Sequence, residues 1–368
     1  MNEEKLNELV GQMLSDLGGA FSMPLVRIGN SLGLYKTLAE EGPFSSHELA
    51  HQTGLAERYL REWLSAMAAS NYITYNPEGG KFSLTEEQTA IFADENSPVY
   101  LVAAFDCAAA NVHNQDKIES VFHTGEGLRW GDQPECLFCA IAKFFRPGYQ
   151  HHIMQDWLPA LDGVVDKLEQ GATVADVGCG HGLSTIMMAE AFPNSQFVGF
   201  DFHEGSIAEA NKHVEEHALS NVRFQTALAK EFDGVGDYDL VCLFDCLHDM
   251  GDPTGAAAHI RSALKPDGTL MVVEPIAEDE VQDNINPVGR LYYAASTMVC
   301  VPTSLAQEVG SALGAQAGEK RLRETIVDGG GFSQFRRAAE TPFNMVLEAL
   351  ILTRFCGHQV KSDNVTIT

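Results

Sequence analysis

The sequence predicts an α/β protein in which a doubly wound parallel sheet follows a mostly helical N-terminal domain. An apolar run ends in an acid at Asp176 and leads into alternating glycines, and a second apolar run ends in Asp201. From there to residue 280, strand patterns alternate with helical ones, as a parallel sheet with helical crossovers requires. Residues 1–95, in contrast, place their apolar residues mainly at helical spacing.

Length and charge narrow the range of functions. The chain has 368 residues, enough for two or three domains, and a formal net charge of −27. Such a charge repels nucleic acid and anionic membranes. The acidic start is unlike a signal peptide, no apolar run is long enough to cross a membrane, and the eight scattered cysteines are expected as reduced thiols. We therefore expect a cytoplasmic protein that binds neither nucleic acid nor membrane.

The first 95 residues are predicted to form a winged helix. Two helical stretches flank a turn at Gly54, and the first begins with a Ser45–Ser46 cap and Glu48 just inside it. The following segment, 72–84, alternates like a hairpin and turns at residues 77–80. This domain holds six Lys and Arg against fourteen Asp and Glu. A net charge of −8 argues against binding to duplex DNA, which depends on neutralising phosphates.

The remaining chain divides into three predicted parts. Residues 96–165 form a helical linker and substrate cover, 166–355 form the sheet domain, and 356–368 form a tail. Strands are expected at 173–177, 196–201, 222–227, 238–244 and 269–274, with two more C-terminal strands at 333–340 and 344–352. Helices are expected at 206–218 and 255–268, and an insertion occupies 278–318.

The segment VADVGCGHG, residues 174–182, carries the main functional signal. It reads as a strand, a tight glycine turn and the start of a helix. Glycines allow positive φ and a close approach of the backbone to a ligand, and a helix N-terminus offers free N–H groups. Asp201 lies 25 residues after Asp176 at the end of the next strand, where an acid can accept hydrogen bonds from both hydroxyls of a ribose.

This order of glycines differs from the dinucleotide pattern. The pattern G-x-G-x-x-G places a pyrophosphate on the helix, whereas this chain has D-x-G-x-G-x-G, with Gly178, Gly180 and Gly182, and no basic residue nearby. A nucleoside ligand without phosphates is therefore favoured. From the residues alone, two alternative interpretations remain: an enzyme that uses a nicotinamide dinucleotide, and a glycine-rich turn that binds no ligand.

The chain resembles bacterial class I S-adenosylmethionine (SAM) methyltransferases that have an N-terminal winged helix and are similar to O-methyltransferases. The resemblance covers about residues 10–355 and is carried by GLYKTLAEEGPFSSHELAHQTGLAERYLREWL, WLPALDGV, VADVGCGHG and FDCLHDMGDP. It implies a Rossmann-like methyltransferase sheet, SAM as cofactor with S-adenosylhomocysteine as product, and a homodimer formed through the N-terminal domain.

The resemblance also implies roles for residues near the sheet. His248 matches the position of a general base above the cofactor methyl group, and a histidine titrates near neutrality as such a base should. The alternative is a structural histidine that only connects its loop to a backbone carbonyl. Asp249 is expected to orient it or to cap the next helix. Phe202, Leu228 and Asp245 are expected beside the cofactor, and Leu228 stands where related enzymes have an acid for the adenine amine.

Candidates for binding the acceptor lie outside the sheet. Arginine and tyrosine side chains can bind a carboxylate, and two clusters hold them, one at 146–158 and one, with Arg290, at 289–296. Surface ion pairs and ordinary packing are the alternatives. The expected substrate-binding residues are Arg146, Tyr149, His152, Tyr292 and Tyr293. The pair Cys136 and Cys139 lacks the second half of a zinc pattern, so no metal site is expected there.

The sequence thus favours O-methylation of a small hydroxylated or phenolic molecule, with His248 as the base. The second hypothesis is an S-methyltransferase of a small thioether acid of the methylthiohydroxybutyrate type, as in dimethylsulfoniopropionate synthesis, because a thioether has no proton to lose. A third hypothesis, from a different class, is a SAM-binding transcriptional regulator, which the winged helix suggests and the acidic N-terminal domain opposes.

Overall fold

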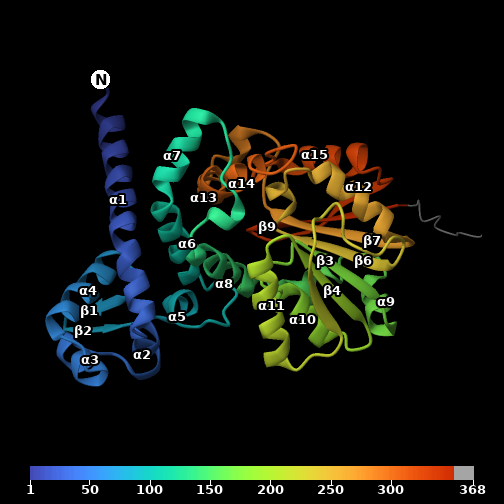
Figure 1. The fold of residues 1–368 in the computed structure, drawn as a ribbon. Coiled ribbons are helices and arrows are strands. Elements are labelled where there is room, and N and C mark those ends of the chain that lie inside the picture. The colour runs from blue at the N-terminus through green and yellow to red at the C-terminus, as the bar shows by residue number, and fades with distance from the viewer. Residues whose placement is uncertain (352–368) are drawn as a thin grey trace, which may run out of the picture.

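The computed structural model describes residues 1–351. Figure 1 shows a small N-terminal domain on one side, a group of helices in the middle and a large twisted sheet with its helices on the other side. In the described part of the chain, no helix is both long and apolar enough to cross a membrane.

The N-terminal domain has the helix-turn-helix and hairpin that the sequence predicts. The cap on α3 is confirmed, because the Ser45 hydroxyl accepts from the Glu48 backbone and the Glu48 carboxylate accepts from the Ser45 backbone. The helix ends at Gly54, whose φ is +71°. The elements are α1 (Glu3–Ser31), α2 (Leu34–Glu41), α3 (Ser46–Thr53), α4 (Glu57–Ala69), β1 (Thr74–Asn76), β2 (Lys81–Ser83) and α5 (Glu86–Phe92).

Helix α1 is longer than its domain requires. Its 29 residues bury only Ser22, Val26 and Gly29, all near its C-terminal end, and Figure 1 shows the other end projecting beyond the domain. Apolar side chains repeat on this projecting part every three or four residues, which is the spacing of one helix face. The exposed apolar residues are Leu6, Leu9, Val10, Met13, Leu14, Leu17, Phe21 and Ile28.

The middle helices connect the two domains and contribute one wall of the site. They are α6 (Val102–His113), α7 (Gln115–Thr124), the short turn η1 (Trp130–Asp132), α8 (Glu135–His152) and the π-helical turn η2 (Ile153–Trp157). Trp157, 1% exposed, buries its ring against the sheet core, so this layer is anchored to the sheet.

The sheet has seven strands in the order β5-β4-β3-β6-β7-β9-β8. The first five in this order are parallel, and β9 pairs antiparallel with both β7 and β8. The chain winds outward from β3 in both directions, and ligands of such sheets bind outside the carboxyl ends of the strands at this switch point. The strands are β3 (Thr173–Val177), β4 (Gln196–Asp201), β5 (Val222–Thr226), β6 (Tyr238–Phe244), β7 (Leu264–Pro275), β8 (Gln334–Glu340) and β9 (Asn344–Leu350).

Both faces of the sheet are buried, which explains why its strands are continuous apolar runs rather than alternating ones. Along β6, Leu240 and Cys242 belong to the core on one face, and Val241 and Leu243 to the core on the other. The helices that cover the two faces, with the short elements of the insertion, are α9 (Val164–Gln170), α10 (Leu183–Ala191), α11 (Glu204–His217), α12 (Pro253–Ala263), α13 (Pro287–Ala295), α14 (Val301–Leu305), α15 (Gly318–Arg323), η3 (Leu247–Asp249), η4 (Val281–Asn284), η5 (Ser296–Cys300) and η6 (Glu324–Gly329).

The helix predicted at 255–268 is too long at its C-terminal end. The structure ends α12 at Ala263, and β7 begins at Leu264, five residues before the predicted strand. Lys265 precedes Pro266, and a residue before proline is disfavoured in the α-helical region, so the helix stops there. The other predicted strands of the sheet agree with the structure to within two residues. The predicted tail, 356–368, lies outside the described residues, and the other domain boundaries stay predictions.

Candidate functional site

A cavity of about 900 Å³ lies at the carboxyl ends of the central strands. Residues just at or after the ends of β3, β4, β6 and β7 line its floor, namely Gly178, Asp201, Asp245 and Pro275. Helices α6, α8 and α13 and the turn η5 supply the opposite walls. The position at the switch point of the sheet is the one where open α/β sheets bind ligands.

The glycine turn after β3 places backbone atoms without side chains at the floor of the cavity. Gly178, Gly180 and Gly182 all have positive φ. A Cβ on Gly178 would lie 2.6 Å from Cys246 Sγ, and one on Gly182 would lie 2.4 Å from the Phe224 ring, so packing as well as backbone conformation excludes side chains there. Around Gly180 the space is open. Gly178 and Gly180 line the cavity, whereas Gly182 packs beneath it.

Asp201 joins the glycine turn to the next strand. The residue is 8% exposed, and its carboxylate accepts from the backbone N–H groups of Gly180 at 2.9 Å and His203 at 2.8 Å. Burial raises the pKa of this carboxyl. Each carboxylate oxygen has two lone pairs, so acceptor capacity remains for hydroxyl groups in the cavity. Phe202 and Leu228 stand beside it, each 44% exposed, as apolar walls of the cavity.

These residues fit the nucleoside part of SAM. The fit rests on three observations: an open backbone turn at Gly180, a buried acid with acceptor capacity, and apolar side chains, Phe202 and Leu228, in the lining of the same cavity. Lys230 is the one Lys or Arg among the described lining residues, and it is paired with Glu308. The site therefore offers no free Lys or Arg for the phosphates of a dinucleotide, which favours an uncharged linkage.

Asp176 lies under the turn rather than in the cavity lining. It is fully buried and accepts from the hydroxyls of Ser184 and Thr185 at 2.7 and 2.6 Å, while its Oδ1 is buried without a hydrogen-bond partner. Burial raises the pKa of Asp176 to about 6. In this structure its contacts hold the first turn of α10 against β3.

Asp245 follows β6 with a φ of +49°. Its two carboxylate oxygens accept from the Tyr149 hydroxyl at 3.0 Å and from the Asn344 amide at 2.7 Å. Burial, reinforced by the charge of Glu274, raises the pKa of Asp245 to about 8. Asn344 gave no signal in the sequence, because it lies 99 positions away at the start of β9.

His248 is buried on the short turn η3 and is held by an acid that sequence reasoning missed. Its Nδ1 lies 2.5 Å from a carboxylate oxygen of Glu274, whose other oxygen accepts from the Leu247 backbone at 3.0 Å. Burial alone would lower the pKa of His248, but the charges of Glu274 and Asp249 outweigh it and hold that pKa above its usual range. The sequence did carry a signal for Glu274, since an acid near the carboxyl end of an apolar, buried strand needs a polar or charged partner.

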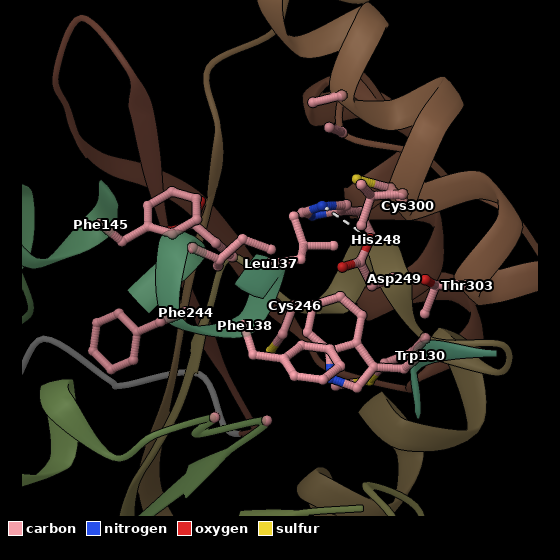
Figure 2. Close-up of a pocket in the computed structure, with 18 of the residues that line it drawn as sticks. Trp130, Leu137, Phe138, Phe145, Phe244, Cys246, His248, Asp249, Cys300 and Thr303 are labelled. Carbon is pink, nitrogen blue, oxygen red and sulfur yellow. Dashed lines mark ion pairs between the residues drawn. The ribbon is translucent and has the colours of Figure 1, made fainter. Parts of the chain in front are cut away.

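A small polar cluster surrounds the other side of this imidazole (Figure 2). Asp249 Oδ1 lies 3.3 Å from His248 Nε2, and Cys300 from η5 completes a group of donor atoms that all lie within 4.8 Å of one another. These side chains line the cavity. Cys300 was not expected here, because the irregular insertion gave no pattern that would bring it back to β6.

The predicted substrate-binding residues separate into two groups. Tyr149 and Tyr292 line the cavity, whereas Arg146, His152 and Tyr293 do not. Tyr292 donates to the Phe343 carbonyl at 2.9 Å, and His152 pairs with Asp156 at 2.6 Å. The related candidate Arg290 binds Asp16 of α1 at 3.0 Å. No guanidinium therefore faces the cavity in the described structure.

Aromatic and aliphatic side chains make up the wall opposite the cofactor floor (Figure 2). The Trp130 and Phe138 rings pack 5.0 Å apart, and Phe138 lies 5.0 Å from His203. Other apolar members of this wall are Leu137, Ile141, Phe144, Phe145, Leu291, Met298 and Val299. This half of the cavity suits an uncharged, largely apolar molecule.

Two family models match the chain. A model described as "Methyltransferase domain" matches residues 168–330, the segment that contains the glycine turn, Asp201 and His248. The chain carries a methyltransferase domain. A model described as "Rv2258c-like winged HTH domain" matches residues 20–93, so this methyltransferase domain follows a winged-helix domain, as the sequence predicted.

Relatives and solved structures agree with this architecture. A ubiquinone biosynthesis O-methyltransferase of Bordetella avium is 27% identical over 157 residues, or 42% of this chain and 59% of that protein; the chain thus spans somewhat over half the length of this relative. Human N-acetylserotonin methyltransferase, solved with SAM, is similar in fold with a TM-score of 0.65 and 18% identity, over 94% of this chain and 98% of that one.

A second solved structure, mitomycin 7-O-methyltransferase, has a TM-score of 0.66 and 19% identity, over 95% of this chain and 98% of that one. At such identities the likeness describes the fold. The methyltransferase fold and the N-terminal winged helix are therefore confirmed for nearly the whole length of the chain.

Proposed function

We propose that this protein is a SAM-dependent methyltransferase of a small molecule. The observation that carries the proposal is the junction of Gly180 and Asp201, where an open glycine turn and a buried acid meet at the floor of the cavity. When bound, SAM supplies an electrophilic methyl carbon. Gly178, Gly180 and Asp201 would hold its nucleoside and amino-acid parts, with Phe202 and Leu228 as walls.

Within this function, O-methylation is the reaction that the acceptor side supports best. A hydroxyl must lose its proton as it is methylated, and a positioned base promotes this step. In its neutral form, His248 donates its Nδ1 proton to Glu274, and its Nε2 is the atom that takes the proton of the acceptor. Because Glu274 and Asp249 hold the pKa of His248 above its usual range, the share of this neutral form rises with pH. The buried carboxylate of Glu274 then stabilises the imidazolium that forms. Asp249 would help to orient the ring on the other side.

The lining favours an uncharged, hydroxylated apolar or phenolic acceptor over a thioether acid. A carboxylate in a buried cavity needs a cationic partner. Arg146 and Arg290 do not line the cavity, and Lys230 is paired with Glu308. Tyr149 and Tyr292 remain as hydroxyl groups that can meet a polar substituent. The S-methyltransferase hypothesis therefore has weaker support than the O-methyltransferase hypothesis.

A regulator that binds DNA is the weakest of the three hypotheses. Its support is the winged-helix domain. That domain has a net charge of −8 over residues 1–95, and helix α4 directs its Arg58 and Arg61 into ion pairs with Glu62 and Glu57. A DNA-binding helix needs free cations to neutralise phosphates.

We also propose a homodimer formed through α1. The apolar stripe on its projecting half includes Leu14 at 65% and Phe21 at 78% exposure. Exposed apolar patches of this kind mark interaction surfaces. A second copy of the same helix offers a self-complementary apolar partner, as a two-fold interface requires.

Transfer of isotope-labelled methyl groups from SAM tests the function. The labelled cofactor is incubated with the protein and a panel of hydroxylated aromatic and thioether acceptors, and products are read by mass spectrometry. We expect labelled ethers or esters. A labelled sulfonium would support the thioether hypothesis instead. Calorimetry on Asp201→Ala tests the cofactor site separately: loss of two charge-assisted hydrogen bonds should weaken SAM binding about 100-fold, whereas the exposed control Glu231→Ala should bind normally.

A further inference from the structure

One hydroxyl group in the described lining of the cavity has no hydrogen-bond partner. It belongs to Thr303, which is 2% exposed and whose Oγ1 is buried and unpartnered. The other hydroxyl groups of that lining are all bonded to protein groups, and they are those of Tyr149, Ser184, Ser206 and Tyr292. Buried polar atoms without partners are rare in folded proteins, so this one calls for an explanation.

The backbone around Thr303 does not supply the usual partner. A threonine inside a helix can donate to the carbonyl group four residues earlier. Several threonines of this chain do so, namely Thr37, Thr53, Thr297 and Thr325. For Thr303, on α14, the corresponding carbonyl is that of Val299, which lies in the π-helical turn η5. Such a turn interrupts the regular spacing of carbonyl groups, and the Thr303 hydroxyl is left free.

Thr303 lies at the same end of the cavity as the proposed base. The Gln307 amide donates to the backbone carbonyls of Asp249 and Thr303 at 2.8 and 3.0 Å, and the Ser304 hydroxyl donates to the Met250 carbonyl at 2.7 Å. These contacts fasten α14 to the turn η3, which carries the imidazole. Figure 2 shows Thr303 beside Asp249 in this part of the lining.

The polar groups next to Thr303 are occupied with one another. The Cys300 thiol donates to the Asp249 carboxylate. The Gln307 side chain uses its nitrogen on two carbonyls and its oxygen to accept from the Gly251 backbone at 3.1 Å. The Thr303 hydroxyl is therefore the group at this end whose proton is available to a bound molecule.

The chemistry of this hydroxyl limits what it can bind. A buried hydroxyl without a partner costs free energy, and a polar atom of a ligand removes that cost. A threonine hydroxyl can donate one hydrogen bond and accept others, and it carries no charge. Since apolar side chains such as Trp130 and Met298 also line the cavity, the matching group is an uncharged oxygen: a hydroxyl, a carbonyl or an ether.

We propose that Thr303 binds a second oxygen of the acceptor, close to the hydroxyl that is methylated. The protein then selects aromatic acceptors that carry two neighbouring oxygen functions, and this inference rests on the proposed function. One oxygen meets His248 Nε2 and the other meets Thr303 Oγ1. Two points of attachment fix the rotation of the ring and so align the reactive oxygen. Thr303 is a specificity-determining residue and takes no part in the proton transfer.

Binding of two matched compounds tests the inference. Calorimetry measures the affinity of the full chain, saturated with S-adenosylhomocysteine, for 2,3-dihydroxynaphthalene and for 2-naphthol, which lacks the second oxygen. The wild type should bind the diol about tenfold more tightly, the effect of one buried hydrogen bond. Thr303→Val keeps the shape of the side chain without the hydroxyl, and its preference should fall below about threefold. Thr303→Ser keeps a hydroxyl and should retain the preference.

Thermal unfolding gives an independent readout. Because the Thr303 hydroxyl has no partner in the protein, Thr303→Val should leave the Tm unchanged or raise it. The control is Thr325→Val. Thr325 is 7% exposed and donates to the Arg321 carbonyl at 2.9 Å, so its loss should lower the Tm and leave the preference for the diol intact.

Several results would overturn the inference: equal affinities of the wild type for the two compounds, no binding of either, a preference that survives in Thr303→Val, or a larger fall in Tm for Thr303→Val than for Thr325→Val. Methyl-label transfer to a broad acceptor panel is measured in parallel. Transfer that Thr303→Val leaves unchanged for every acceptor keeps the proposed function and removes the role of Thr303. SAM binding without transfer to any acceptor contradicts the proposed function itself.

Discussion

At the scale of single residues, the His248–Glu274 contact makes the sharpest prediction about turnover. His248→Ala should lower kcat about 10²–10⁴-fold, because the group that receives the acceptor proton is lost. Glu274→Gln keeps the ring but removes the charge 2.5 Å from Nδ1, and a loss of about 10–100-fold is expected. Calorimetry should give unchanged SAM affinity for both. Undiminished turnover in His248→Ala would favour an acceptor sulfur that has no proton.

Asp176 makes a prediction about stability and pH. Its pKa is raised by burial from 3.8 to about 6 in the folded protein, so the folded state binds this proton more tightly than the unfolded state does. The resulting stabilisation is complete below about pH 4 and is lost as the pH rises through 6. Between pH 5 and 8, the wild type should therefore lose on the order of 1 kcal/mol relative to Asp176→Asn. Urea unfolding of both proteins at the two pH values measures this difference, and parallel curves would contradict the buried, protonated acid.

At the scale of elements, two glycines of the turn after β3 are expected to have different roles, one in stability and one in cofactor binding. In Gly182→Ala, the new Cβ would lie 2.4 Å from the Phe224 ring at a φ of +76°, so the free energy of unfolding should fall by about 1–3 kcal/mol. Gly180→Ala meets open space at a φ of +52°, so its methyl group should mainly obstruct the ligand. Thermal unfolding without SAM and calorimetry with SAM should rank the two variants in opposite orders; equal losses in both measurements would refute this division.

The apolar stripe of helix α1 leads to a prediction about the oligomeric state of the protein. Met13 and Phe21, on its apolar stripe, are 51% and 78% exposed. Met13→Glu/Phe21→Glu should convert a species with the mass of two chains into one with the mass of a single chain, because like charges would face each other at a two-fold interface. Light scattering after gel filtration measures this. Asn7→Glu, an exposed polar position of the same helix, is the control and should stay dimeric.

For the whole molecule, the sequence allowed prediction of those helices and strands that are specified by a local pattern of residues. The strands that end at Val177, Asp201 and Phe244 were recognisable because buried parallel strands are short apolar runs, and the capping box at Ser45 is a local motif. These elements give the sheet order near the switch point and therefore the cofactor floor.

The acceptor side could not be predicted, because long-range contacts build it. Glu274 meets His248 across 26 positions, and Asn344 meets Asp245 across 99. Arg290 looked like an acceptor ligand in the sequence, but Asp16, 274 positions away, binds it instead. Hydrophobic periodicity predicts single helices and strands but not such contacts. They depend on how β7, β9 and the insertion are arranged around the end of β6.

The place of β9 also has a consequence for the order of biosynthesis. This strand is made after every other strand of the sheet, yet it lies between β7 and β8 and supplies the Asn344 amide to Asp245. During translation, the glycine turn and Asp201 therefore emerge long before the sheet can close around them. Until residues 344–350 leave the ribosome, β7 keeps an open apolar edge that is free to pair with other chains. A nascent chain of this protein is thus expected to depend on chaperones until β9 has been made and has paired with β7.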